Sequence, residues 1–161
     1  MSLSLLNFNK IFLVKQPMGL AGVGASLAVN AYRTLKLLDF SITVVGDHYD
    51  PLCGLNHELG FIAGNNILEG LKLDVVVQDD ASCRTESDDW SAFDSVLTKS
   101  GAFPMLRRVS VGILWYSVFD EDEESGWQDH VLESLKEDKF PRLVESKAVE
   151  FKFRAEIRYE W

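Results

Sequence analysis

Residues 102–113 read AFPMLRRVSVGI and residues 140–153 read FPRLVESKAVEFKF, so one pattern occurs twice in the second half of the chain. In each stretch a Phe-Pro pair is followed by a leucine and then by alternating apolar and polar residues. Proline disfavours a helical conformation in the residue before it, which predicts that a helix ends at each pair. The alternation predicts a strand with one buried face. Both stretches therefore predict a helix, a turn and a strand.

The same unit recurs over a larger part of the sequence. The residues that repeat at an offset of 37 are Trp90 and Trp127, Phe103 and Phe140, Pro104 and Pro141, and Leu106 and Leu143. A strand template of the form Leu-x-x-Leu-x-Leu also occurs upstream, in residues 35–40 (with Phe in the last place) and 68–73. Its offsets are 33 and then 38 residues, and the last unit needs about three additional residues before its strand. Repeats of this length are typical of units that bury their apolar faces by stacking.

The sequence therefore predicts an α/β fold in which parallel strands alternate with helices, as a leucine-rich-repeat-like solenoid fragment. With 47% hydrophobic residues, 1–161 is predicted to form a single domain of irregular units of about 33–38 residues. Residues 1–33 form an atypical N-terminal part, and four strand-bearing units follow. The clearest helix places Trp90, Phe93 and Leu97 on one face. The weakest precedes residue 68, where three glycines lower helix propensity.

The stretches 102–113 and 140–153 resemble the C-terminal leucine-rich-repeat region of F-box-type proteins of mushroom-forming fungi. The resemblance runs from about residue 34 onward and is most specific in the last two units. Two departures are that no F-box-like helical segment precedes the repeats and that the repeat asparagine is missing from most units. The resemblance implies binding of a protein partner, a role near ubiquitin ligation, and a truncated member of the family.

Composition restricts the class of partner and the cellular compartment that we expect. The chain has 25 acidic and 16 basic side chains, and a net charge of −9 repels phosphate backbones, which argues against nucleic acid. The longest uncharged span, residues 16–32, is shorter than the roughly 20 apolar residues of a membrane-spanning helix. Two cysteines do not form a disulfide framework in a chain of this length. We therefore expect an intracellular protein, cytoplasmic or nuclear, that neither crosses a membrane nor binds nucleic acid.

A glycine-rich turn, Gly19, Gly22 and Gly24 within GLAGVGAS, provides an alternative function. Glycines between a strand and a helix, with an acid such as Asp47 further on, are typical of dinucleotide-binding oxidoreductases. Residues 15–18 separate the strand from this turn, and Pro17 disrupts the tight entry that the motif needs. We therefore prefer a second interpretation, in which small residues let a helix over about residues 21–32 pack closely on the sheet.

Other reactive residues predict no further site. His48, Cys53 and His57 lack the short paired spacing of a zinc site, so they are interpreted as ordinary polar residues. The acidic stretch 120–124 is interpreted as a solvated loop before a helix. No nucleophile motif is present. The sequence therefore predicts no catalytic residues, no metal and no cofactor.

The outward side chains of the predicted strands form the best candidate binding surface. Strands that stack in register expose alternate residues in rows and so present a polar face that carries both signs of charge. The same residues would also serve simply to keep an exposed sheet soluble. The predicted partner-binding residues are Asp39, Ser41, Lys72, Asp74, Arg108, Ser110, Tyr116, Glu150 and Lys152. Their predicted function is non-enzymatic recognition of another protein.

Overall fold

The structure is a computed structural model that describes residues 10–15, 20–30, 33–45, 52, 54–78, 88–117 and 134–159. Several residues considered above lie outside these ranges. They are Gly19, Asp47, His48, Cys53, the acidic stretch 120–124 and Trp127.

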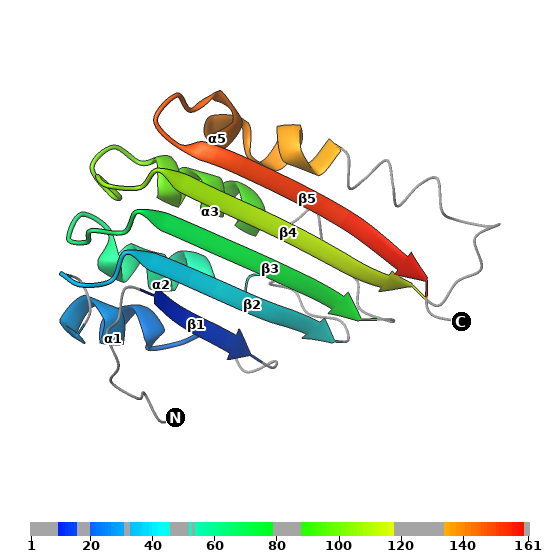
Figure 1. The fold of residues 1–161 in the computed structure, drawn as a ribbon, viewed down its shortest axis with the longest axis horizontal. Coiled ribbons are helices and arrows are strands. Elements are labelled where there is room, and N and C mark those ends of the chain that lie inside the picture. Colours follow the sequence, from blue (N-terminus) through cyan, green and yellow to red (C-terminus); the bar gives the residue numbers. More distant parts are fainter. Residues whose placement is uncertain are drawn as a thin grey trace.

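Strands and helices alternate along the described chain, which confirms the predicted α/β class (Figure 1). The elements are β1 (Lys10–Lys15), α1 (Val23–Asn30), β2 (Leu37–Val45), α2 (Leu55–Ile62), β3 (Gly70–Gln78), α3 (Asp88–Thr98), β4 (Arg108–Ser117), α5 (Pro141–Glu145) and β5 (Glu150–Tyr159). Residues 134–139, just before α5, are also helical. The helix that the sequence supported least, α2, is short because Gly54 and Gly64 flank it with positive φ angles of 81° and 78°.

The five described strands form one parallel sheet in the order β1-β2-β3-β4-β5. Each connection moves the chain one strand further in the same direction. Because connections between parallel strands are right-handed, successive helices fall on the same side of such a sheet. Figure 1 shows α1, α2, α3 and α5 together on one face, so the described chain forms two layers, a sheet and a row of helices.

The strand register reproduces the offsets of 33 and 38 residues, because Leu37 pairs with Gly70 and Gly70 pairs with Arg108. Two details of the predicted units were wrong. β1 pairs with β2 at an offset of 27 residues, so a fifth strand precedes the four that were predicted. Arg108 pairs with Glu150 at an offset of 42, five more than the repeat of 37 and not about three. The additional residues lie between Leu143 and Glu150, where the chain completes α5 before it enters the strand.

The core lies between the sheet and the helices. Trp90, Phe93 and Leu97 of α3 are buried, as the helical pattern predicted. The ring of Phe140 meets the Trp90 ring edge to face, with centroids 5.9 Å apart. On the sheet, the inward residues of β3 that are buried are Leu71, Leu73, Val75 and Val77. The repeated Phe103 and Phe140 are both buried, so each Phe-Pro pair closes the core before its strand. The second pair is not followed by the predicted turn, because Pro141 begins α5.

The glycines of the N-terminal turn allow α1 to touch α2. A Cβ atom on Gly24 would lie 2.0 Å from the carbonyl oxygen of Glu58, a distance that no side chain tolerates. Gly22 has a φ of 85°, which glycine adopts without strain. Leu27 of α1 is buried in the core, and α1 lies within the range predicted for this helix. Close packing therefore accounts for Gly24 and backbone conformation for Gly22, although the contact with α2 was not predicted.

The same turn is closed by a buried carboxylate. The backbone N–H groups of Gly22 and Gly24 donate hydrogen bonds to Glu58, at 3.2 and 2.6 Å, and Glu58 is only 5% exposed. A dinucleotide site would offer such amides to a pyrophosphate and would lie where the strand order reverses. In the described sheet Glu58 holds the amides and the strand order does not reverse. These observations do not favour the dinucleotide interpretation.

Buried polar side chains also link other neighbouring units. The carboxylate of Asp94 in α3 accepts the backbone N–H groups of Arg142 and Leu143, at 3.2 and 2.8 Å, where α5 begins. The side-chain amide of Asn66 donates to the carbonyl oxygens of Ile62 and Ala102 at 2.7 and 2.8 Å, and so joins the loops that precede β3 and β4. Each link satisfies backbone groups that burial would otherwise leave unpaired.

Candidate functional site

The face of the sheet opposite the helices is the candidate functional site (Figure 1). No described helix covers it, and its side chains are the strand residues that alternate with the core residues. We call this surface, over β2 to β5, the open face. It consists of Leu37, Asp39, Ser41, Thr43, Gly70, Lys72, Asp74, Val76, Gln78, Arg108, Ser110, Gly112, Leu114, Tyr116, Glu150, Lys152, Arg154, Glu156 and Arg158.

The strand register arranges the open face in rows that cross the strands. The first row is Leu37, Gly70, Arg108 and Glu150; the second is Asp39, Lys72, Ser110 and Lys152; the third is Ser41, Asp74, Gly112 and Arg154. Tyr116 lies further along, paired in register with Arg158. All nine residues predicted from the sequence therefore share one face. Asp39, however, is only 8% exposed, so it contributes less surface than the alternation suggested.

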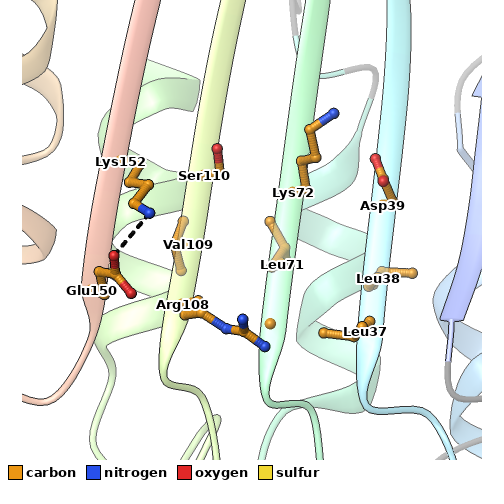
Figure 2. Close-up of a pocket in the computed structure, with 11 residues that line it drawn as sticks. Leu37, Leu38, Asp39, Leu71, Lys72, Arg108, Val109, Ser110, Glu150 and Lys152 are labelled. Carbon is orange, nitrogen blue, oxygen red and sulfur yellow. Dashed lines mark ion pairs between the residues drawn. The ribbon is translucent and has the colours of Figure 1, made fainter.

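A hollow of about 280 Å³ opens on the first two rows, near the N-terminal ends of the strands (Figure 2). Six of the predicted residues line it, which are Asp39, Lys72, Arg108, Ser110, Glu150 and Lys152. Leu37 and Gly70 line it as well, and the sequence interpretation had not included either. The hollow exists because Gly70 contributes no side chain to a row whose other members are large.

Most charges on the open face are neutralised within their own strand. Lys72 forms an ion pair with Asp74, Lys152 pairs with Glu150 at 2.9 Å, and Arg158 pairs with Glu156 at 2.9 Å. Each pair joins residues two apart, which alternation sets on the same face. The hydrogen bond from Lys72 to Asp74 raises the pKa of the lysine, and the hydrogen bond from Arg158 lowers the pKa of Glu156.

Two arginines on the open face are exceptions to this pairing. Neither Arg108 nor Arg154 forms an ion pair or a side-chain hydrogen bond with the described part of the chain. The open face carries five basic and four acidic side chains, a net charge of +1, although the whole chain has a net charge of −9. The open face is therefore much less acidic than the chain as a whole, and its two unpaired charges are positive.

Beyond the charged rows, the open face becomes less polar. Val76 and Leu114 are paired in register and half-buried, and Tyr116 follows two residues later on the same face. The sequence interpretation placed Tyr116 outward but did not include the two aliphatic residues. The same alternation would have identified them, because they continue the outward positions of β3 and β4. The charged residues of these rows, Glu156 and Arg158, lie on β5, so the apolar side chains of the open face gather over β3 and β4.

No family model, curated protein or solved structure matches this chain. The described residues contain no group of three or more His, Cys, Asp or Glu side chains that could hold a metal ion. His57, the one described member of the candidate metal set, instead packs its ring against Phe61, with centroids 4.9 Å apart. Among the helices that the structure describes, none has the length and apolar character needed to cross a membrane.

Proposed function

We propose that the chain is a leucine-rich-repeat-like solenoid whose open face recognises a protein partner without catalysing a reaction. The observation that carries this proposal is a five-stranded parallel sheet in sequential order with helices on one face only. Such an arrangement leaves a broad, regularly spaced surface for contact with another macromolecule.

The chemistry of the open face supports a protein as the partner. Protein interfaces combine an apolar centre with a polar rim and favour tyrosine and arginine at the positions that contribute most to binding. On the open face, Leu114 and Tyr116 of β4 are large apolar and aromatic side chains, and Arg108 and Arg154, which form no ion pair with the described part of the chain, lie on the same face. Nucleic acid is a poorer partner, because the chain as a whole carries a net charge of −9.

The resemblance of residues 102–113 and 140–153 to F-box-type repeat proteins extends the proposal. By that resemblance, the partner is a protein that is presented for ubiquitin ligation. The resemblance lies in the units that form β4 and β5, which supply ten of the open-face residues. This extension is tested separately, by asking whether ubiquitin-ligase adaptor proteins co-purify with the chain from native extract.

The proposal itself is tested by reversing two charges in the first two rows of the open face. In the variant Lys72→Glu, Arg108→Glu, both altered side chains are exposed, so we expect the fold to persist and capture of the partner to fall. The matched control is Lys99→Glu, Lys147→Glu, which alters exposed residues in loops away from the open face and makes the same change in net charge. Proteins retained by each immobilised variant are quantified by mass spectrometry, and circular dichroism checks the fold.

The proposal predicts that proteins captured by the unmodified chain are lost from the open-face variant and kept by the control. Equal capture by both variants would show that the open face is not the recognition surface. Equal loss from both would assign capture to non-specific electrostatic attraction, which also contradicts the proposal.

A further inference from the structure

The hollow on the open face is built by a gap in one row of side chains. Neighbouring strands lie about 4.8 Å apart, so Leu37 and Arg108, on either side of Gly70, are separated by roughly 10 Å at the backbone. A Cβ atom at Gly70 would come within 2.8 Å of the Leu37 side chain, which therefore leans over the glycine. Figure 2 shows Arg108 extending from β4 and Leu37 from β2, both toward β3. An aliphatic wall and a guanidinium thus face one small space.

The guanidinium in this space forms no ion pair with the described part of the chain. The pKa of Glu69 is lowered mainly by the hydrogen bond from Lys36, which holds Glu69 at 2.7 Å, and to a smaller extent by the charge of Arg108. Glu150, the neighbour of Arg108 in the row, is held by Lys152 at 2.9 Å, and Asp74 is held by Lys72. Arginine carries five N–H donors in a planar fork that matches the two oxygens of a carboxylate. Three basic side chains (Lys72, Arg108 and Lys152) and two acidic ones (Asp39 and Glu150) line the hollow. The lining therefore has a net positive charge, which favours a negatively charged group.

We propose that the hollow binds the carboxylate of an aspartate or glutamate side chain of the partner protein, with Arg108 as its bidentate donor. The Leu37 side chain contacts the methylene groups of the bound residue. This inference rests on the proposed function and specifies the chemistry that the open face recognises.

The charge of the whole chain restricts the sequence around that acidic residue. A net charge of −9 repels a segment that carries many acids. Charges are screened beyond roughly 8 Å at physiological salt, whereas the contact with Arg108 acts at hydrogen-bond distance. We therefore infer a segment with a single acid among neutral or basic residues, and not an acidic tract.

The test uses an array of short synthetic peptides of varied sequence, each with a fixed central Asp, Asn, phosphoserine or Lys. Binding of the full chain is compared with that of Arg108→Gln and of Arg107→Gln. Arg107 is exposed just before β4 and does not line the hollow, so its substitution changes the net charge equally and serves as the matched control. Affinities of selected peptides are then measured by fluorescence anisotropy.

We expect Asp-centred peptides to bind roughly tenfold more tightly than their Asn counterparts, since a hydrogen bond to a charged group contributes about that factor. Arg108→Gln is expected to abolish this preference, Arg107→Gln to keep it, and Arg108→Lys to keep only part of it because the planar fork is lost. An Asp preference that is unchanged in Arg108→Gln would overturn the inference. A preference for phosphoserine without one for Asp would also overturn it, in favour of a phosphate.

Two further outcomes separate this inference from the proposed function. Binding of neutral peptides that Leu114→Asp abolishes and Arg108→Gln leaves intact would overturn the acidic hollow but support recognition through the open face. Absence of binding to any peptide would count against both.

Discussion

The buried carboxylate of Glu58 is predicted to hold the first helix on its neighbour, and Glu58→Gln tests this with little change in shape. An amide can accept only one of the two N–H bonds that the carboxylate accepts from Gly22 and Gly24, and its own NH₂ group then faces the other amide. In the variant, one charge-assisted hydrogen bond to residue 58 becomes a neutral hydrogen bond, and the other is lost, which leaves a backbone N–H without its acceptor. Together these changes are expected to cost about 2–4 kcal/mol.

The lost stability should show first as local opening of α1 and not as unfolding of the whole chain. In the described chain α1 has α2 as its neighbouring helix and β1 has only β2 as a neighbouring strand, so this terminal unit can open while the rest stays folded. Opening of α1 then becomes roughly 30- to 1,000-fold more frequent, which is the same free energy expressed as an equilibrium constant. Native-state hydrogen exchange read by mass spectrometry measures this directly in Val23–Asn30. Exchange in Asp88–Thr98 provides the internal reference.

Glu145→Gln is the matched control, because it removes the same charge from an exposed position in α5. Exposed substitutions of this kind change stability by no more than about 0.5 kcal/mol, so exchange in α1 should not change. The reasoning would be refuted if Glu58→Gln left α1 as well protected as the control does. It would also be refuted if Asp88–Thr98 lost as much protection as α1, because the carboxylate would then stabilise the whole fold and not the contact between two helices.

Two further predictions concern the second buried acid and the hollow. Burial raises the pKa of the Asp94 carboxyl above 3.8, an effect that outweighs the lowering by its two backbone hydrogen bonds. The folded state therefore holds this proton more tightly than the unfolded chain, and stability from this group is lost as pH rises from 3.8 through the raised value. Urea unfolding should show the stability of the unmodified chain falling relative to Asp94→Asn over that window, and a difference that stays constant or grows would contradict the assignment. Gly70→Ala should weaken the binding of Asp-centred peptides several-fold by filling the hollow. The fold should stay intact, because the one close contact of the added methyl is with the flexible end of Leu37 and its distance to the Arg108 carbonyl oxygen is an ordinary 3.9 Å. Unchanged affinity in the same anisotropy assay would show that the peptides bind elsewhere.

Much of the sheet could be predicted because strand alternation is a local property of the sequence. Val109, Val111 and Ile113 are buried as the alternation indicated, and the outward residues between them lie on the open face. The helix before Phe140 ends there as predicted, because proline limits the conformation of the residue before it. The predicted turn after this pair was wrong, because Pro141 begins the short helix α5. The first strand was not counted as a repeat unit, because its connection to β2 is shorter than the others and its segment lacks the leucine template.

The candidate site was predictable in part for the same reason. Alternation placed Lys72, Arg108 and Lys152 on one face, but it could not show which charges were already neutralised. Arg108 forms no ion pair with the described part of the chain because its acidic neighbours are held by lysines, and this depends on side-chain positions. Gly70 was overlooked because a missing side chain becomes a hollow only when large neighbours flank it across the strands.

By itself, the sequence determined the alternation of helices with the strands β2 to β5 and the two faces of those strands, since both follow from periodicity and from residues close along the chain. Only the tertiary structure decided which residues, distant in the sequence, come into contact. Glu58 lies 34 residues from Gly24, yet it accepts the Gly24 N–H, and Leu37 lies 71 positions before Arg108, yet both flank Gly70 in one row. Such relations depend on the lengths of the connections between strands, because these lengths fix the register in which distant segments come side by side.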